Sequence, residues 1–380
     1  MSVGNAPALA IDQRIDELIR GPQYARPQAE KESILVPLLR DLCRDMAGRC
    51  PPYGRFLERL GGDPDGWQTT AHVPPLPLAM FKLFTLAAVP PEKIVRELHS
   101  SSTTGQQPSR IVLDKTTAFR QARALAAVLK EHVGGQRRPL LVLDAPEVVG
   151  EGDSLTARGA AIRGVANFGS EVAFAMRRLP SGDLEPDWDR IDAFFDAHQD
   201  GPVLLFGFTF IVWTRFVVEA EQSGRRFRAG RALLLHSGGW KKLQAQAVSK
   251  EELSRRTSAV LGCPHENILD FYGMVEQVGT VFVDCEAGSK HAPAFADVIL
   301  RRPGSLDAVA IGETGIIEVL SILPASYPGH ALITEDQGVL VGADDCPCGR
   351  KGRYFRFTSR IERAEVRGCG DVFAQSREIR

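Results

Sequence analysis

The sequence predicts an α/β protein with a layered, mostly parallel sheet, followed by a smaller β-rich subdomain. Between residues 110 and 262, apolar strand-like runs such as PLLVLDAP and PVLLFGFTF alternate with longer helix-like segments. Such alternation is typical of parallel sheets whose faces are covered by helices. From about residue 277, helix-like segments give way to short strand-like runs such as TVFVDC and GIIEVLSIL, which predicts a more antiparallel subdomain.

The elements follow in order along the chain. IDQRIDELIR, KESILVPLLRDLCRDMA and GRFLERL carry Leu and Ile at helical spacing and predict helices, whereas PPLPLAMFKLF predicts an extended connector punctuated by Pro. Beyond residue 115, helices are predicted for TTAFRQARALAAVLKEHV, WDRIDAFFDAH, IVWTRFVVEAEQSG and KKLQAQAVSKEELSRRTSAVLG. We therefore expect a helical segment over 1–60, an α/β core over 61–276, a β-rich subdomain over 277–360 and a tail over 361–380.

Composition excludes several classes of protein. The 380 residues are 44% hydrophobic and carry a net charge of −1, so no basic excess indicates a nucleic-acid partner. No apolar run approaches the roughly 18 residues of a membrane span, and the amphipathic N-terminus does not resemble a signal peptide. Seven cysteines in so long a chain argue against a disulfide framework and favour a cytoplasmic protein with metal or thiol chemistry.

The loop HSSSTTGQQPSR, residues 99–110, combines five hydroxyl residues in a row with a glycine. Backbone amides and hydroxyls beside a strand form a nest for phosphate oxygens. A Walker-type loop is excluded, because Gln106 follows Gly105 where that motif needs Lys. A plain surface loop rich in Ser and Thr is the alternative, and it is the better interpretation of this loop taken alone.

Two further motifs suit a nucleotide. In HSGGWKK, residues 236–242, two glycines after a buried strand leave room for a flat ring, although an ordinary strand-to-helix turn has the same pattern. In DFYGMVEQ, residues 270–277, Tyr272 offers a stacking face and Glu276 offers a carboxylate for Mg²⁺. A turn with a solvated Glu is the alternative interpretation.

The order SSSTTG, HSGGW, DFYGMVEQ, ITED and SRIE resembles the adenylate-forming superfamily of acyl and aryl ligases. The resemblance implies that ATP and Mg²⁺ are bound. It places the phosphates at Ser101, Ser102, Thr103, Thr104 and Gly105, with Ser102 where the family usually has glycine. It places adenine and ribose at Ser237, Gly238, Gly239, Tyr272, Gly273, Asp336 and Arg360, and it assigns Mg²⁺ to Glu276. Thr104 and Glu276 would then be catalytic.

Within that superfamily, the motifs HSSSTTG, SLTARGAAIRG, LFGFTF, HSGGWK and DFYGMVEQ resemble the LuxE-like acyl-protein synthetases. This resemblance implies that a fatty acid is activated as an acyl-adenylate and passed as a thioester to a thiol. It also implies that the large adenylation domain is present and that the usual small C-terminal domain is lacking. Cys369 is the candidate thiol, and the candidates to replace that domain's lysine are Lys82, Lys241 and Lys242.

Four residues predict a zinc site. Cys285 and His291 form one pair and Cys346 and Cys348 another, and these ligand types suit tetrahedral Zn²⁺ in a structural role. The pattern resembles that of some zinc-binding relatives among the phenylacetate-CoA-ligase-like enzymes. Four unrelated residues in ordinary turns remain the alternative.

Three functions stay open. The first is an acyl-protein synthetase that loads its own cysteine or a partner reductase. The second is a ligase that makes an acyl- or aryl-CoA or loads a carrier protein. The third is a nucleotide-binding partner subunit without catalytic activity.

Overall fold

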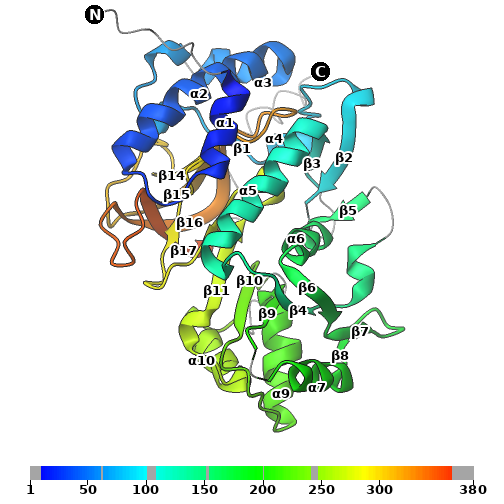
Figure 1. Ribbon diagram of the computed structural model, residues 1–380. Helices are drawn as coiled ribbons and strands as arrows, with labels where there is room; N and C mark the ends of the chain where they lie inside the picture. Colours follow the sequence, from blue (N-terminus) through cyan, green and yellow to red (C-terminus); the bar gives the residue numbers. More distant parts are fainter. Residues whose placement is uncertain are drawn as a thin grey trace, which may run out of the picture.

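The computed structural model describes residues 10–60, 63–100, 108–150, 154–199, 201–240 and 247–361. The chain begins with three helices, α1 (Ile11–Arg20), α2 (Gln28–Arg49) and α3 (Pro51–Leu60). Their apolar residues recur at helical spacing and face inward, as Ile15, Leu18 and Ile19 do in α1. Figure 1 shows these helices grouped beside the C-terminal sheet. In the described ranges, no helix is both long enough and apolar enough to cross a membrane.

The predicted parallel sheet is present. Its strand order is β12-β11-β10-β9-β4-β6, and every neighbouring pair is parallel except β11 with β12. The strands are β4 (Arg138–Leu143), β6 (Gly169–Phe174), β9 (Leu204–Phe208), β10 (Leu233–Ser237), β11 (Ile268–Gly273) and β12 (Val281–Val283).

Helices cover this sheet on both faces, which explains why its strands read as continuous apolar runs. On β4, Leu140 and Val142 enter the core on the side of α5 (Lys115–Val133) and α6 (Ala157–Ala166). Leu141 and Leu143 enter the core on the opposite side. The helices of that second side are α7 (Trp188–Ala197), α9 (Val218–Gln222) and α10 (Lys250–Leu261).

The second large sheet is antiparallel, as predicted, apart from one parallel edge strand. Its order is β13-β17-β16-β15-β14, and β1 pairs in parallel with β16. The strands are β1 (Leu76–Pro77), β13 (Lys290–His291), β14 (Ala296–Arg301), β15 (Thr314–Ser321), β16 (Ala331–Ala343) and β17 (Arg353–Arg360). In Figure 1, α5 lies between this sheet and the parallel one.

The smaller elements complete the described part of the chain. A three-stranded sheet contains β2 (Ile94–His99), β3 (Arg110–Asp114) and β5 (Ser154–Thr156), and β7 (Met176–Arg178) pairs with β8 (Leu184–Pro186). The short helices are η1 (Pro64–Gly66), η2 (Thr70–His72), α4 (Met80–Leu83), η3 (Pro91–Lys93), η4 (Pro146–Val149), α8 (Thr209–Ile211), the π-helix η5 (Val212–Val217), η7 (His265–Asn267) and η8 (Val275–Gln277).

Two local predictions were wrong. The connector predicted to be extended is extended only in its first half, which contains β1, and forms α4 after the last proline of that run. The helix predicted from Lys241 is not continuous in the described residues, which resume at 247: residues 247–249 are not helical and α10 begins at Lys250, where the Ser249 side chain accepts a hydrogen bond from the Glu252 backbone and caps the helix.

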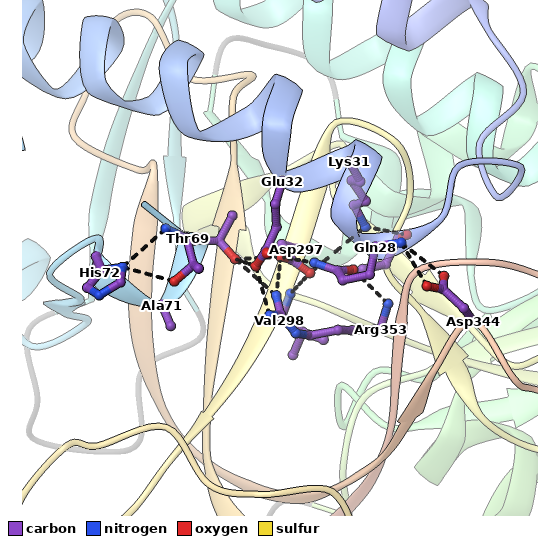
Figure 2. Close-up of polar contacts among 12 residues, drawn as sticks. Gln28, Lys31, Glu32, Thr69, Ala71, His72, Asp297, Val298, Asp344 and Arg353 are labelled. Carbon is purple, nitrogen blue, oxygen red and sulfur yellow. Dashed lines mark hydrogen bonds and ion pairs between the residues drawn. The ribbon is translucent and has the colours of Figure 1, made fainter. Parts of the chain in front are cut away.

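A buried cluster around Asp297 joins α2 to the C-terminal sheet. Oδ2 of Asp297 accepts hydrogen bonds from Gln28 Nε2 at 2.9 Å, Thr70 Oγ1 at 2.7 Å and Arg353 Nη1 at 2.6 Å. Figure 2 shows Gln28 and Lys31 reaching from α2 to this carboxylate and its neighbours. Although burial alone raises the pKa of Asp297, Arg353 and Lys31 hold it below its usual value. The carboxylate therefore stays charged and fully bonded at a position without solvent contact.

We expect Asp297→Ala to lower the free energy of unfolding by about 3–5 kcal/mol, because it leaves buried cationic and polar groups without their acceptor. Urea denaturation measures this loss. The control is Arg302→Ala, which removes the exposed ion pair with Glu313 and should cost about 1 kcal/mol or less. Equal losses in the two variants would contradict the role given to the Asp297 cluster.

Candidate nucleotide-binding site

The candidate site lies where the carboxyl ends of the parallel strands meet the C-terminal sheet. Ligands of open parallel sheets bind beyond the carboxyl ends of the strands. Ser237 ends β10 and Gly238 and Gly239 follow it, Tyr272 and Gly273 end β11, and Glu276 lies in η8. Asp336 and Arg360 are neighbours on β16 and β17 of the other sheet.

Tyr272 and Asp336 join the two sheets directly. The Tyr272 hydroxyl donates a hydrogen bond to Asp336 Oδ2 at 2.8 Å. Burial raises the pKa of Asp336, while the Tyr272 hydrogen bond and the charge of Arg360 lower it. The Tyr272 ring also stacks on Phe357, with the ring centroids 6.0 Å apart. Three residues predicted to bind the nucleoside therefore lie together, and Arg360 is held by an ion pair with Glu335.

The two glycines after β10 form an open shelf beside β9 and β11. Ser237 is buried and pairs with Phe208 on one side and Phe271 on the other. Gly238 has a φ of 86°, and a Cβ there would lie 3.4 Å from Phe208 Cδ1. Because both glycines are exposed, the shelf leaves backbone accessible to a flat ring, as the motif predicted.

Glu276 is a buried carboxylate with positive charge nearby, and only 6% of its surface is exposed. Burial raises its pKa, while the Ser109 hydroxyl and the charges of Lys82 and Arg360 lower it. Of the three lysines predicted to replace the lysine of the small C-terminal domain, Lys82 on α4 lies in the described residues, close enough for its charge to act on Glu276. Lys241 and Lys242 lie outside the described residues.

The base of the predicted phosphate loop is closed by two serines. The Ser100 backbone donates to the Ser109 carbonyl at 3.1 Å, and the Ser109 backbone donates to Ser100 Oγ at 2.8 Å. These bonds extend the pairing of His99 with Arg110 on β2 and β3. The loop residues Ser101, Ser102, Thr103, Thr104 and Gly105 lie outside the described residues, as does Cys369, so their roles stay predictions.

Ser109 is a candidate site residue that the motif comparison missed. Its side chain is buried close enough to Glu276 to favour the carboxylate form, although its hydroxyl makes no hydrogen bond of good geometry. Its position in the sequence could have indicated this role, because Ser109 lies directly before β3 and opposite Ser100 across the loop.

The four predicted zinc ligands converge in the β-rich part. The ligand atoms of Cys285, His291, Cys346 and Cys348 all lie within 4.8 Å of one another. The Cys285 and Cys346 sulfurs are 3.8 Å apart, and Cys348 Sγ is 3.4 Å from His291 Nε2. Tetrahedral zinc with Zn–S bonds of about 2.3 Å requires sulfurs about 3.8 Å apart. The donor set and its spacing therefore fit a zinc ion.

The aromatic residues of β9 and of the helical turn that follows it belong mainly to the core. Phe206 and Trp213 are buried, and Phe208 packs partly buried against both cores. Phe208 also lies against Gly238, since a Cβ built on that glycine would be 3.4 Å from Phe208 Cδ1.

We expect Ser109→Ala to raise the pKa of Glu276, because the variant removes a hydroxyl that favours the charged carboxylate. A carboxylate with a higher pKa becomes protonated at a higher pH, so the acid limb of Mg²⁺-dependent ATP binding should move to higher pH. Calorimetric titrations across the acid range measure this shift. Ser181→Ala, which removes an exposed hydroxyl in the β7–β8 turn, is the control and should leave the profile unchanged. A profile unchanged in Ser109→Ala contradicts the assignment.

The chain is similar over nearly its whole length to known acyl-protein synthetases. The family model of the acyl-protein synthetases, LuxE, matches residues 2–377. A long-chain-fatty-acid–luciferin-component ligase of Vibrio harveyi is 24% identical over 376 residues, which covers 97% of this chain and 95% of the relative. The ligase of the same description from Aliivibrio fischeri is 24% identical over 151 residues, 39% of each chain.

Solved structures show the same fold. An open conformation of 2-hydroxyisobutyryl-CoA ligase, in complex with 2-HIB-AMP and CoA, aligns with a TM-score of 0.64 at 17% identity and covers 95% of this chain and 80% of that one. The thioesterification state of the same ligase aligns with a TM-score of 0.65 at 18% identity over 90% and 70% of the two chains. The fold is therefore that of the adenylate-forming ligases, as the motifs predicted. Because the family model spans nearly the whole sequence, the chain belongs to the LuxE family of acyl-protein synthetases.

Proposed function

We propose that this chain activates a long-chain fatty acid with ATP and passes the acyl group to a thiol. Membership of the acyl-protein synthetase family supports the reaction class, and the relative from Vibrio harveyi supports the choice of acid. The observation that carries the proposal is the Tyr272–Asp336 hydrogen bond, which brings two predicted nucleoside contacts from different sheets into one place near Arg360.

The site residues suit the first half-reaction. The acid carboxylate attacks the α-phosphorus of ATP, the bond to the β-phosphate oxygen breaks, and pyrophosphate leaves with acyl-adenylate as the product. Tyr272 and the Gly238 shelf offer flat surfaces for adenine, and Asp336 offers acceptors for ribose hydroxyls. Lys82 offers a positive charge for a phosphate or carboxylate oxygen. Glu276 would hold Mg²⁺, which when bound neutralises charge on the phosphates.

The second half-reaction transfers the acyl group to sulfur. A thiolate attacks the carbonyl carbon of the acyl-adenylate, AMP leaves, and a thioester forms. Candidate acceptors are Cys369 of this chain, a thiol of a partner reductase or carrier protein, and coenzyme A. We place the protein in the cytoplasm, since none of the six described cysteines forms a disulfide.

We further propose a structural zinc ion at the cysteine–histidine cluster. It would tie the β12–β13 connection, with Cys285, to the loop between β16 and β17, which carries Cys346 and Cys348. Four protein ligands complete a tetrahedral site and leave no position for substrate. We also keep residue boundaries at 60, 276 and 360 as the proposed division of the chain into helical segment, core, β-rich subdomain and tail.

The function is tested by trapping acyl-adenylate with hydroxylamine in the presence of ATP, Mg²⁺ and a series of fatty acids. Wild-type protein should form hydroxamate with long-chain acids. Glu276→Gln should reduce the rate roughly a hundredfold, because Mg²⁺ loses a charged ligand beside the phosphates. Glu266→Gln, an exposed change in η7, should retain the wild-type rate.

The same reaction with labelled acid separates the acceptors. Label retained on denatured wild-type protein and lost in Cys369→Ala supports self-acylation, whereas label that moves only to added coenzyme A supports a CoA ligase. ATP binding without hydroxamate from any acid contradicts the enzymatic proposal and supports the partner-subunit alternative.

The zinc site predicts about one metal ion per purified chain by elemental analysis. Cys346→Ser should lose most of that metal and melt at a lower temperature, since a bound metal stabilises the folded state that holds it. Cys263→Ser removes a buried thiol that is not part of the cluster and should retain the metal. A wild-type chain purified without zinc, or a Cys346→Ser variant that keeps its zinc, contradicts the proposal.

A further inference from the structure

A buried tyrosine holds the backbone of Glu276 in place. Tyr327 lies in the turn between β15 and β16 and has no exposed surface. Its hydroxyl donates a hydrogen bond to the Glu276 carbonyl at 2.9 Å. The same oxygen accepts a hydrogen bond from Gln121 Nε2 at 3.0 Å. Both capacities of the hydroxyl are thereby used, and α5 is connected through Tyr327 to the turn that carries the candidate Mg²⁺ ligand.

The turn that carries Tyr327 is also fixed to the strand that follows the predicted phosphate loop. Ser326 Oγ donates to the Val112 carbonyl of β3 at 2.8 Å. The backbone amides of Ala325 and Ser326 both donate to Thr117 Oγ1 in the first turn of α5, at 3.0 and 3.1 Å. Because β3 begins one residue after Ser109, this turn links Glu276 to the base of the loop through a short chain of buried bonds.

The segment that follows Glu276 packs tightly against Gln121 of α5. Gly279, three residues after Glu276, has a φ of 89°, and a Cβ there would lie 2.5 Å from the Gln121 carbonyl oxygen. The next side chain after Glu276 is fixed as well, since Gln277 Nε2 donates to the Gly329 carbonyl at 2.7 Å. The Glu276 segment is therefore confined between α5 and the turn that carries Tyr327.

We propose that Tyr327 and Gln121 are positioning residues for adenylation, an inference that rests on the function proposed above. They hold Glu276 at a fixed position relative to Ser100 and Ser109, so that its carboxylate is placed to meet the Mg²⁺ of a Mg²⁺–ATP complex. Neither residue touches the nucleotide. Tyr327 and Gln121 should affect the part of ATP binding that depends on Mg²⁺. The candidate nucleoside contacts, Tyr272 and Asp336, have no hydrogen bond with Tyr327 in the described residues.

Tyr327→Phe tests this proposal, with Tyr53→Phe as the matched control. Tyr53 is also buried and lies beside the Cys43 thiol, but it is on α3, away from the candidate site. ATP binding is measured by calorimetry without fatty acid, so that no turnover occurs, at increasing Mg²⁺ and separately in EDTA. We expect Tyr327→Phe to raise the Mg²⁺ concentration for half-maximal ATP binding about fivefold, the effect of one buried hydrogen bond. Binding in EDTA should match that of Tyr53→Phe.

A second pair of variants separates positioning from stability. Gln121→Leu should raise the Mg²⁺ requirement in the same way. In the double variant with Tyr327→Phe, no amide is left without an acceptor, so the melting temperature should recover while the Mg²⁺ requirement stays raised.

The proposal is overturned if Tyr327→Phe and Tyr53→Phe need the same Mg²⁺ concentration, or if the Mg²⁺ requirement of the double variant recovers together with its melting temperature. Both results leave the proposed function intact, because they presuppose wild-type binding that depends on Mg²⁺. Wild-type protein that binds no ATP, or binds it equally with Mg²⁺ and EDTA, overturns the proposed function and this inference with it.

Discussion

The candidate site depends on one hydrogen bond between two sheets, from the Tyr272 hydroxyl to Asp336. Tyr272 ends a strand of the parallel sheet and Asp336 lies within the long strand of the antiparallel sheet. An isolated backbone bridge between Asp284, directly after β12, and Lys290 of β13 joins the two sheets at one edge. At the candidate site, the Tyr272–Asp336 side-chain contact joins them. The contact is partly buried, where a hydrogen bond to a carboxylate is stronger than in water. A nucleoside bound there would touch both sheets at once.

Two sets of buried polar groups hold the antiparallel sheet, which supplies Asp336, against its neighbours. The Asp297 cluster fixes α2 to β14 and β17, and so stabilises the sheet that supplies Asp336 and Arg360. On the other side, the turn with Ser326 and Tyr327 fixes that sheet to β3 and α5. Both sets are satisfied almost completely by protein donors and acceptors, and such networks favour a single arrangement over a mobile one. This rigidity suits a reaction that requires several groups to contact one triphosphate simultaneously.

Much of the fold was predictable because it follows from local periodicity. The parallel sheet was predicted from apolar runs that alternate with helices, and the antiparallel sheet from closely spaced short strands. The order of the motifs also predicted that Tyr272 and Asp336 would belong to one site. Local pattern did not predict α4, because the prolines before it indicated an extended connector. It also did not predict the start of α10, which a serine cap determines rather than apolar periodicity.

The contacts that sequence reasoning missed join residues far apart in the chain. Gln121 and Tyr327 are separated by 206 positions, and neither stands in a motif. Their pairing follows from how α5 packs between the sheets, which no local periodicity encodes. Ser109 was hidden for another reason, since its neighbours in the loop have the same chemistry and only the strand pairing singles it out.

The most direct measurement of the central claim is a crystal structure of the protein with acyl-adenylate bound. The account predicts nucleotide density at the junction of the two sheets, with the adenine against Tyr272 and the ribose hydroxyls on Asp336. Density for the nucleotide at another surface, with the Tyr272–Asp336 hydrogen bond untouched by ligand, would contradict it.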